Sequence, residues 1–163
     1  MRAEFCNAYE PLAFAGFLPT LPVMSLQVTH LEKSLHTLAV ALERLREAPP
    51  QSDDYDVFRN AVVKGFELSL ETSGKLLRRA LKAYEGDPKT IDSLVFKDVI
   101  RHGAKHSLIE AGAVERWFAY RDNRNSTAHD YGAAFAEHTL RLLDDFVRDA
   151  RALSAALQSA HHA

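Results

Sequence analysis

Leucine and valine recur every three or four positions in residues 28–45. The apolar positions there are Val28, Leu31, Leu35, Leu38, Leu42 and Leu45. Because side chains three and four residues apart lie on one face of an α-helix, this pattern predicts a helix with a narrow apolar face. Pro49 and Pro50 follow and predict the end of that helix, since proline does not continue one.

A second apolar pattern of helical period covers residues 58–84. Its positions are Phe58, Val62, Phe66, Leu70, Leu77, Leu81 and Tyr84, and its one wider step spans Ser73. The preceding residues 51–54, QSDD, supply side chains that cap helix N-termini. The sequence from Gly86 to Pro88 is typical of a helix end. We therefore expect a second long helix.

Three further helical patterns complete the chain. A shorter one contains Leu94, Val95, Phe96, Val99 and Ile100, with Gly103 placed to end it. The next contains Val114, Trp117 and Phe118, aromatic residues that we expect in the core. A last long one follows Gly132 and contains Phe135, Leu142, Leu143, Phe146, Ala150, Leu153 and Leu157. Since no segment alternates as a strand does, we predict an all-α fold, an antiparallel up-and-down bundle of four long helices plus a short one.

The chain fits a single domain, because 163 residues, 47% of them hydrophobic, suffice for one core. We assign the bundle to residues 24–158 and a tail to residues 159–163. Residues 1–23 combine three prolines with a short apolar run and do not match a signal peptide. We expect an unstructured extension, with Met24 as the start of the functional chain; the alternative is an arm packed on the bundle.

Charge and cysteine content narrow the classes of function. Twenty Lys and Arg residues against 22 Asp and Glu give a formal charge of -2, so no general attraction to nucleic acid or anionic membrane is expected. Any phosphate binding must then be local. The only cysteine, Cys6, excludes a disulfide framework and favours a cytoplasmic protein. No apolar run reaches the length of a membrane span.

Phosphate-binding and proton-transferring side chains gather in residues 121–131, RDNRNSTAHDY. On an ideal helix Arg121, Asn125 and His129 share one face, whereas Arg124 lies about 140° from His129 and reaches the same ligand only by its length or by a distortion of the helix. Arginine matches phosphate oxygens, and histidine transfers protons near neutral pH. The segment is thus equipped for phosphodiester chemistry without a metal, with a proton moved by His129 and charge stabilised by Arg124.

A structural role for the same residues is equally compatible with the spacing. Asn125 and His129 could satisfy buried backbone groups, with the two arginines solvated or paired to Asp122 and Asp130. The spacing by itself does not decide between the two interpretations.

Two glutamates four residues apart, Glu67 and Glu71, form a second candidate group. Paired carboxylates can perform acid–base chemistry. However, Lys64 and Lys75 extend the same helical face and favour a solvated row of ion pairs.

Two remaining groups carry weaker signals. His102 and His106 have a zinc-like spacing, but the glutamate of the H-E-x-x-H motif is missing, and we expect no metal site. The basic cluster of Arg78, Arg79 and Lys82 is either solvated or able to contact RNA backbone.

The segment RNSTAHDY, residues 124–131, resembles the R-x-x-x-x-H-x-Y signature of HEPN proteins (higher eukaryotes and prokaryotes nucleotide-binding), in particular of the nucleotidyltransferase substrate-binding family. Three further segments are similar to that family: FELSLETSGKLLRRALK, FKDVIRHGAKHSLI and WFAYRDNRN. Together the resemblance covers roughly residues 24–157. One departure is Gly74, where the family usually has tryptophan before Lys75, and it bears on local packing and on the wall of any pocket there.

The resemblance implies a helical bundle that forms a homodimer, within a hetero-oligomer that includes a minimal nucleotidyltransferase. Active relatives are metal-independent endoribonuclease toxins without a cofactor, which cleave RNA by attack of the 2'-hydroxyl. In this chain the resemblance assigns catalysis to Arg124, His129 and Asn125, and modification by the partner to Tyr131.

The same resemblance gives Arg121, Glu67 and Glu71 supporting roles, with the glutamates able to orient Arg124 or His129. It also leaves an alternative open, since other family members are non-catalytic subunits that bind substrate, RNA or a nucleotide, for the transferase.

The assignment of residues 1–23 leads to a first prediction. A chain that starts at Met24 should keep the helical content and the thermal midpoint of the full chain, because an extension without packing contacts adds no stability. Circular dichroism melts of the two chains provide the measurement. A fall of several degrees in the midpoint would show that an arm packs on the bundle.

Overall fold

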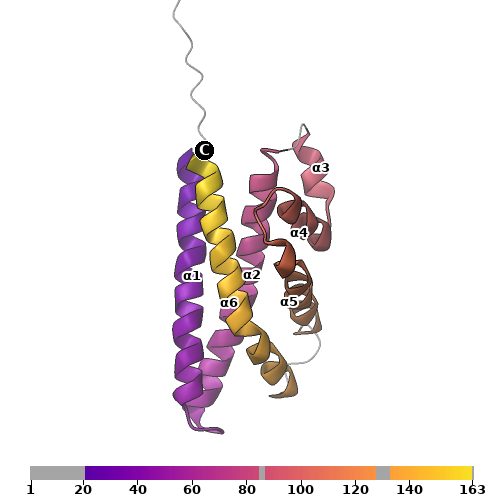
Figure 1. Cartoon of the computed structure of the whole chain (residues 1–163). Coiled ribbons are helices and arrows are strands. Elements are labelled where there is room, and N and C mark those ends of the chain that lie inside the picture. The colour runs from indigo at the N-terminus through magenta and orange to yellow at the C-terminus, as the bar shows by residue number, and fades with distance from the viewer. Residues whose placement is uncertain (1–20, 85–86, 128–132, 163) are drawn as a thin grey trace, which may run out of the picture.

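The computed structural model describes residues 21–84, 87–127 and 133–162, and within these ranges every regular element is helical (Figure 1). The long helices are α1 (Leu21–Glu47), α2 (Asp53–Leu81) and α6 (Ala133–His162), and each of them contacts the other two. The all-α prediction is confirmed.

A second layer of shorter helices covers one side of α2 and α6. It consists of α3 (Pro88–Ser93), α4 (Phe96–Lys105), the 3-10 helix η1 (Ala111–Ala113) and α5 (Val114–Thr127). Helix α4 packs on α2 and α5, and α5 also packs on α6. In Figure 1, α1, α2, α5 and α6 alternate in direction, so α5 is the fourth helix of the up-and-down bundle. It is shorter than the other three, with 14 residues against 30 in α6.

The core forms where the predicted apolar faces meet. Every predicted position of α1 is at most 5% exposed. Four aromatic side chains join α2, α5 and α6 edge to face, an arrangement that their ring quadrupoles favour. They are Phe66, Trp117, Tyr120 and Phe146, with ring centroids 4.8–6.0 Å apart in the contacting pairs. The prediction that Trp117 and Phe118 lie in the core is confirmed.

Polar residues mark the ends of α2 and the start of α3. The Ser52 hydroxyl accepts a hydrogen bond from the backbone N–H of Tyr55 at 3.1 Å and caps α2. Helix α2 ends at Leu81, three residues before the predicted Tyr84. Asp87 and Pro88 belong to the segment that we predicted to end α2, but they also begin α3. Asp87 caps the N-terminus of α3, and Pro88 is its first residue. The apolar pattern did not predict this short helix.

The prediction that Gly103 ends α4 is wrong, because α4 continues to Lys105. Ser107, with a φ of 58°, ends it instead, and the N–H of Leu108 donates to the carbonyl of Gly103, as in a Schellman motif. Gly103 allows close packing of α4 on α2, since a Cβ atom there would lie 3.0 Å from a methyl group of Leu77.

The chain ends differ from their predicted bounds. Helix α1 begins at Leu21, while residues 1–20 of the predicted extension lie outside the described residues. Helix α6 runs to His162, so residues 159–162 continue the last helix where we predicted a tail. In the described ranges, no helix combines the length and apolar character needed to cross a membrane.

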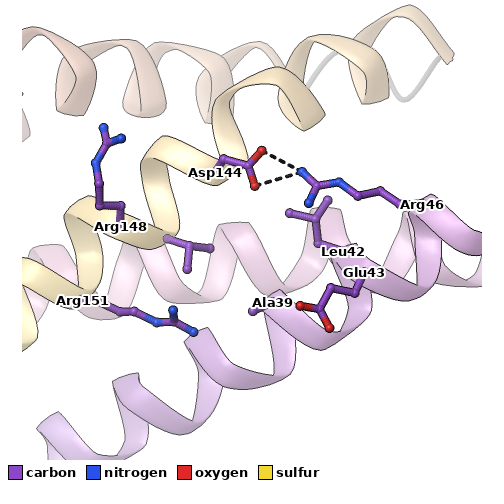
Figure 2. Close-up of a pocket in the computed structure, with 8 residues that line it drawn as sticks. Ala39, Leu42, Glu43, Arg46, Asp144, Arg148 and Arg151 are labelled. Carbon is purple, nitrogen blue, oxygen red and sulfur yellow. Dashed lines mark hydrogen bonds and ion pairs between the residues drawn. The ribbon is translucent and has the colours of Figure 1, made fainter.

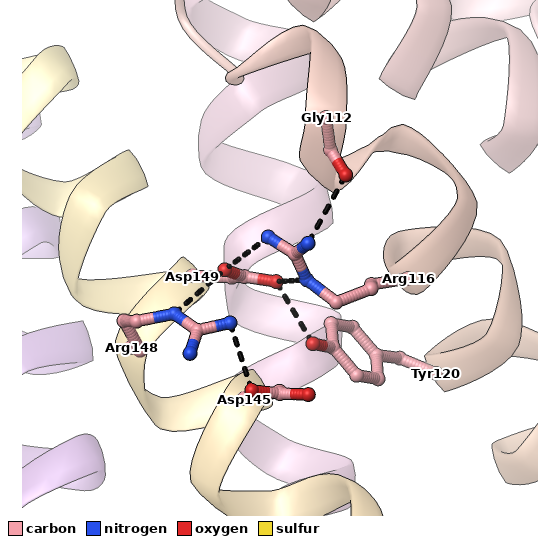
Figure 3. A network of polar contacts seen from close by, with 6 residues as sticks. All are labelled: Gly112, Arg116, Tyr120, Asp145, Arg148 and Asp149. Atoms are coloured by element: carbon pink, nitrogen blue, oxygen red, sulfur yellow. Dashed lines mark hydrogen bonds and ion pairs between the residues drawn. The ribbon is translucent and has the colours of Figure 1, made fainter.

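A buried carboxylate fastens α5 to α6. Asp149, 6% exposed, accepts two hydrogen bonds from the Arg116 guanidinium at 2.8 and 2.9 Å, and one from the Tyr120 hydroxyl at 2.8 Å. Arg116 also donates to the carbonyl of Gly112, while Arg148 approaches Asp149 from its own helix (Figure 3). Because both oxygens of the carboxylate are engaged, this network fixes the height and rotation of α5.

The network also sets the ionisation of its members. Burial acts to raise the pKa of the Asp149 carboxyl, but hydrogen bonds from Arg116 and Tyr120 outweigh it and hold the pKa below its ordinary value. Burial and the hydrogen bond to Asp149 raise the pKa of Tyr120. Asp149 is therefore ionised and Tyr120 protonated at neutral pH.

Asp149→Asn should lower the free energy of unfolding by about 3 kcal/mol, the lower end for disrupting a buried ion pair. For a chain of this size, that equals a fall in thermal midpoint of roughly 6–12 °C. The matched control is Asp144→Asn on the same helix, because Asp144 pairs with Arg46 at the surface and should contribute at most about 1 kcal/mol. Equal losses in the two variants would contradict the anchoring role of Asp149.

The same comparison should depend on pH in one direction. Because the pKa of Asp149 is lower in the folded chain than in the unfolded chain, its contribution is complete above about pH 4 and is lost as the pH falls through the folded value. Chemical denaturation at a series of pH values should thus show the wild type and Asp149→Asn converging only below about pH 4.

Candidate functional site

Helix α5 carries the first part of the predicted motif to its C-terminal end. Arg121, Arg124 and Asn125 lie in its last two turns, and the helix ends at Thr127. His129 and Tyr131 lie outside the described residues. The predicted polar stripe can therefore be followed in the structure only through Arg121 and Asn125.

The Arg124 guanidinium points toward α2 and meets Glu71. The distance from Nη2 of Arg124 to Oε1 of Glu71 is 3.5 Å, and the two side chains are 31% and 44% exposed. The Nε atom of Arg124 is buried. An ion pair this exposed contributes little to the stability of the fold. The Arg124 guanidinium can therefore contact a bound phosphate oxygen as well as Glu71 with little loss of stability.

Glu67, one turn before Glu71, has a different partner. Its carboxylate accepts from the ammonium of Lys64 at 3.3 Å, on the same helix. The prediction of a row of ion pairs along this face of α2 therefore holds for Glu67. Glu71 instead reaches across to α5.

Arg121 lies over the ring of Phe96, with 5.1 Å between the guanidinium carbon and the ring centroid. Asp122, its neighbour in sequence, accepts from Lys97 of α4 at 2.9 Å. The structure therefore pairs Asp122 with Lys97, and Arg121 contacts Phe96 in place of the predicted alternative partner Asp122. The two arginines of the motif diverge, Arg121 toward α4 and Arg124 toward α2.

The two asparagines of α5 lie in opposite environments. Asn125 is exposed, whereas Asn123 is 5% exposed and donates from Nδ2 to the Thr139 hydroxyl of α6 at 3.0 Å. Asn123 was not among the predicted site residues. Its signal was the spacing from Tyr120, because a residue three positions after a buried one shares its helical face. Asn123 fastens α5 to α6 directly before Arg124.

A pocket of about 490 Å³ opens beside these groups, between α2, α4 and α5. Its walls include Glu71 from the first helix and Arg121 from the third. The other lining residues are Gly74, Lys75, Arg78, Leu94, Val95, Phe96 and Val99. Glu71 therefore borders both the pocket and the Arg124 guanidinium.

The basic cluster on α2 is largely engaged in structure. Arg78 donates to the backbone carbonyls of Ile91 and Leu94 and so holds the segment around α3 against α2. Lys82 pairs with Asp92 at 2.7 Å.

His102 of α4 and His106, directly after that helix, belong to no cluster of metal-ligating side chains in the described residues. The His106 ring stacks on Tyr84 with centroids 4.5 Å apart, and His102 is half-buried. In the part of the chain that the structure describes, no three side chains of His, Cys, Asp or Glu come together as metal ligands would.

A second pocket, of about 370 Å³, lies between α1 and α6 (Figure 2). Its rim contains Arg46, Arg148 and Arg151. Nη2 of Arg46 donates to both carboxylate oxygens of Asp144, at 2.9 and 2.7 Å, and Arg148 is engaged by neighbouring carboxylates of its own helix. Because no motif residue lines it, this pocket is a weaker candidate for a functional site.

Comparison with known proteins places the chain in a class. A solved structure from Haemophilus influenzae, described as the fold of a substrate-binding domain of a nucleotidyltransferase, superposes with a TM-score of 0.66 and 27% identity. The match covers 85% of this chain and 98% of that one. The all-helical arrangement is thus that of a known domain type.

A family model described as nucleotidyltransferase substrate binding protein like matches residues 26–159. The chain belongs to this family, and the resemblance inferred from its motifs is confirmed. A protein named probable ribonuclease HepT, from Haemophilus influenzae, is 33% identical over 92 residues. That match spans 56% of this chain and 62% of the relative's length.

Proposed function

We propose that this protein is the HEPN subunit of a two-component, toxin–antitoxin system, and that it is a metal-independent endoribonuclease. The observation that carries the proposal is the placement of Arg124, held by Glu71 at the end of α5, five residues before His129. The similarity to a probable ribonuclease supports the choice of reaction.

The proposed reaction uses the substrate's own nucleophile. A ribose 2'-hydroxyl attacks the adjacent phosphorus and the bond to the 5'-oxygen breaks, which leaves a 2',3'-cyclic phosphate and a 5'-hydroxyl. His129 takes the proton from the nucleophile or gives one to the leaving oxygen. Arg124 stabilises the negative charge that gathers on the phosphate oxygens, Asn125 positions the phosphate, and Glu71 orients Arg124.

The proposed partner is a minimal nucleotidyltransferase, a kind of partner that the family supports. In this proposal the partner neutralises the nuclease by transferring the nucleotidyl group of a nucleoside triphosphate to the Tyr131 hydroxyl, with release of pyrophosphate. Tyr131 lies two residues after His129, so an added nucleotide would place negative charge and bulk beside the proton-transferring group.

A non-catalytic, substrate-binding subunit is the second candidate function. It is supported by the solved relative, which is described as a substrate-binding domain of a nucleotidyltransferase. Expression without the partner distinguishes the two, because only the nuclease should arrest growth and degrade RNA. Purified protein that leaves a range of RNAs intact and does not slow growth would favour the binding subunit.

The nuclease proposal predicts the products and the residues required. RNA cleavage should persist in EDTA and yield 2',3'-cyclic phosphate ends. His129→Ala should reduce its rate by at least about a hundredfold, because a general acid or base is lost. Arg124→Ala should be similarly damaging, because charge on the phosphate is left uncompensated. Gel analysis of a labelled RNA gives both the rates and the end groups.

Matched controls separate chemistry from general damage. His138→Ala and Arg141→Ala change exposed side chains of the same types on α6 and should leave the rate unchanged. A rate as low in these controls as in His129→Ala would overturn the assignment of the motif.

The proposal also predicts assembly. Because a bundle with charged outer faces carries a motif short of catalytic partners, we expect two copies to complete the site, and the chain should be a dimer or larger at micromolar concentration. Light scattering that reports only an 18.2 kDa monomer would count against a shared site.

A further inference from the structure

The pocket between α2, α4 and α5 has the size and charge of a site for an anionic ligand. Its volume of about 490 Å³ lies within the range of small-molecule sites, roughly 300–1,000 Å³. Three cations, Lys75, Arg78 and Arg121, line it against one carboxylate, Glu71. Since Glu71 is itself paired with Arg124, the pocket presents net positive charge in a chain whose formal charge is -2.

Gly74 lets the Phe96 ring pack closely against α2 in the wall of this pocket. A Cβ atom at this position would lie 3.1 Å from Cε2 of Phe96, so even an alanine would press on the ring. A glycine inside a helix costs about 1 kcal/mol relative to alanine. The absence of a side chain at Gly74 therefore allows the close approach of Phe96 to α2.

The Arg121 guanidinium lies over the Phe96 ring in the pocket wall, and we call this pair the Arg121–Phe96 platform. They lie 5.1 Å apart in a cation–π contact, which holds the guanidinium in place. No carboxylate in the described ranges lies within ion-pair distance of Arg121. Nucleic-acid bases stack on aromatic rings and on guanidinium planes of this kind.

Lys75 supplies a cation whose charge is not neutralised within the described part of the chain. Its side chain is exposed, lies one turn after Glu71, and forms no ion pair there. Arg78, by contrast, uses its guanidinium on the carbonyls of Ile91 and Leu94 and builds the wall. Lys75 is thus the ammonium available to a phosphate.

We propose that this pocket binds one nucleotide, with the base stacked on the Arg121–Phe96 platform and the phosphate on Lys75. The inference rests on the proposed function in one respect: Glu71 joins the pocket to Arg124, so the bound nucleotide is the one next to the phosphate that is cleaved. It extends that function by assigning Arg121 and Lys75 to substrate binding and not to the chemical step.

The test measures binding to the full chain without any cleavage. The probes are 5'-AMP, adenosine, inorganic phosphate, and a short 2'-O-methyl oligonucleotide that cannot be cleaved through its 2' position. We expect 5'-AMP and the oligonucleotide to bind in calorimetry, and adenosine and phosphate to bind at least about tenfold more weakly, since each lacks one half of the contacts. Amide NMR shifts should map binding to Gly74, Lys75 and Arg121.

Three variants test the residues. Lys75→Gln and Arg121→Gln should each weaken 5'-AMP binding about tenfold or more, the loss expected for a charge-assisted hydrogen bond or a stacking partner. Gly74→Leu should abolish it, because the new side chain occupies the pocket. Lys33→Gln and Arg141→Gln, at exposed sites on other helices, are the matched controls and should bind as the wild type does. Thermal melts verify that every variant is folded.

The outcomes separate this inference from the nuclease proposal. If the wild type binds 5'-AMP at the pocket yet cleaves no RNA, the nucleotide site stands and the nuclease fails. If the wild type cleaves RNA while folded Lys75→Gln, Arg121→Gln and Gly74→Leu keep its KM, the site is overturned and the nuclease stands. Phosphate binding as tightly as 5'-AMP, or equal competition by an acidic peptide, would also overturn a nucleotide site. The expected result is a raised KM with kcat retained.

Discussion

The placement of α5 depends on one buried carboxylate. Asp149 on α6 engages the guanidinium of Arg116 and the hydroxyl of Tyr120, and the ring of Tyr120 packs in turn against Phe146 and Trp117. Removal of this charge from water is costly unless every oxygen finds a donor, so the network fixes α5 in rotation and height.

The candidate site follows from that placement. Because the Arg116 and Tyr120 side of α5 faces α6, Asn123 also meets α6, and the next residue, Arg124, emerges toward Glu71 on α2. Arg121 lies one turn earlier and emerges over α4. The rotation of α5 therefore places Arg124 beside Glu71, where we propose the catalytic site, and Arg121 in the wall of the neighbouring pocket.

Much of the fold could be predicted from the sequence, because helical periodicity is a local property. The leucine pattern of α1 and the aromatic positions of α5 were expected in the core and lie there. Predictions failed where one residue served two purposes. Gly103 has the residue type of a helix terminator but packs closely against Leu77, and Asp87 follows one helix while capping the next. Such roles depend on neighbours distant in sequence.

The sequence by itself determined the all-helical class, the family and the residue types of the motif. Helical spacing and a motif such as RNSTAHDY are local features that can be recognised within a short stretch of sequence. Only the tertiary structure decided which glutamate meets Arg124, which side Arg121 takes, and that Gly74 borders a pocket. Glu67 and Glu71 are equivalent by spacing alone. The packing of α5 across α2 makes them different, because it brings a guanidinium to one and leaves the other to its own helix.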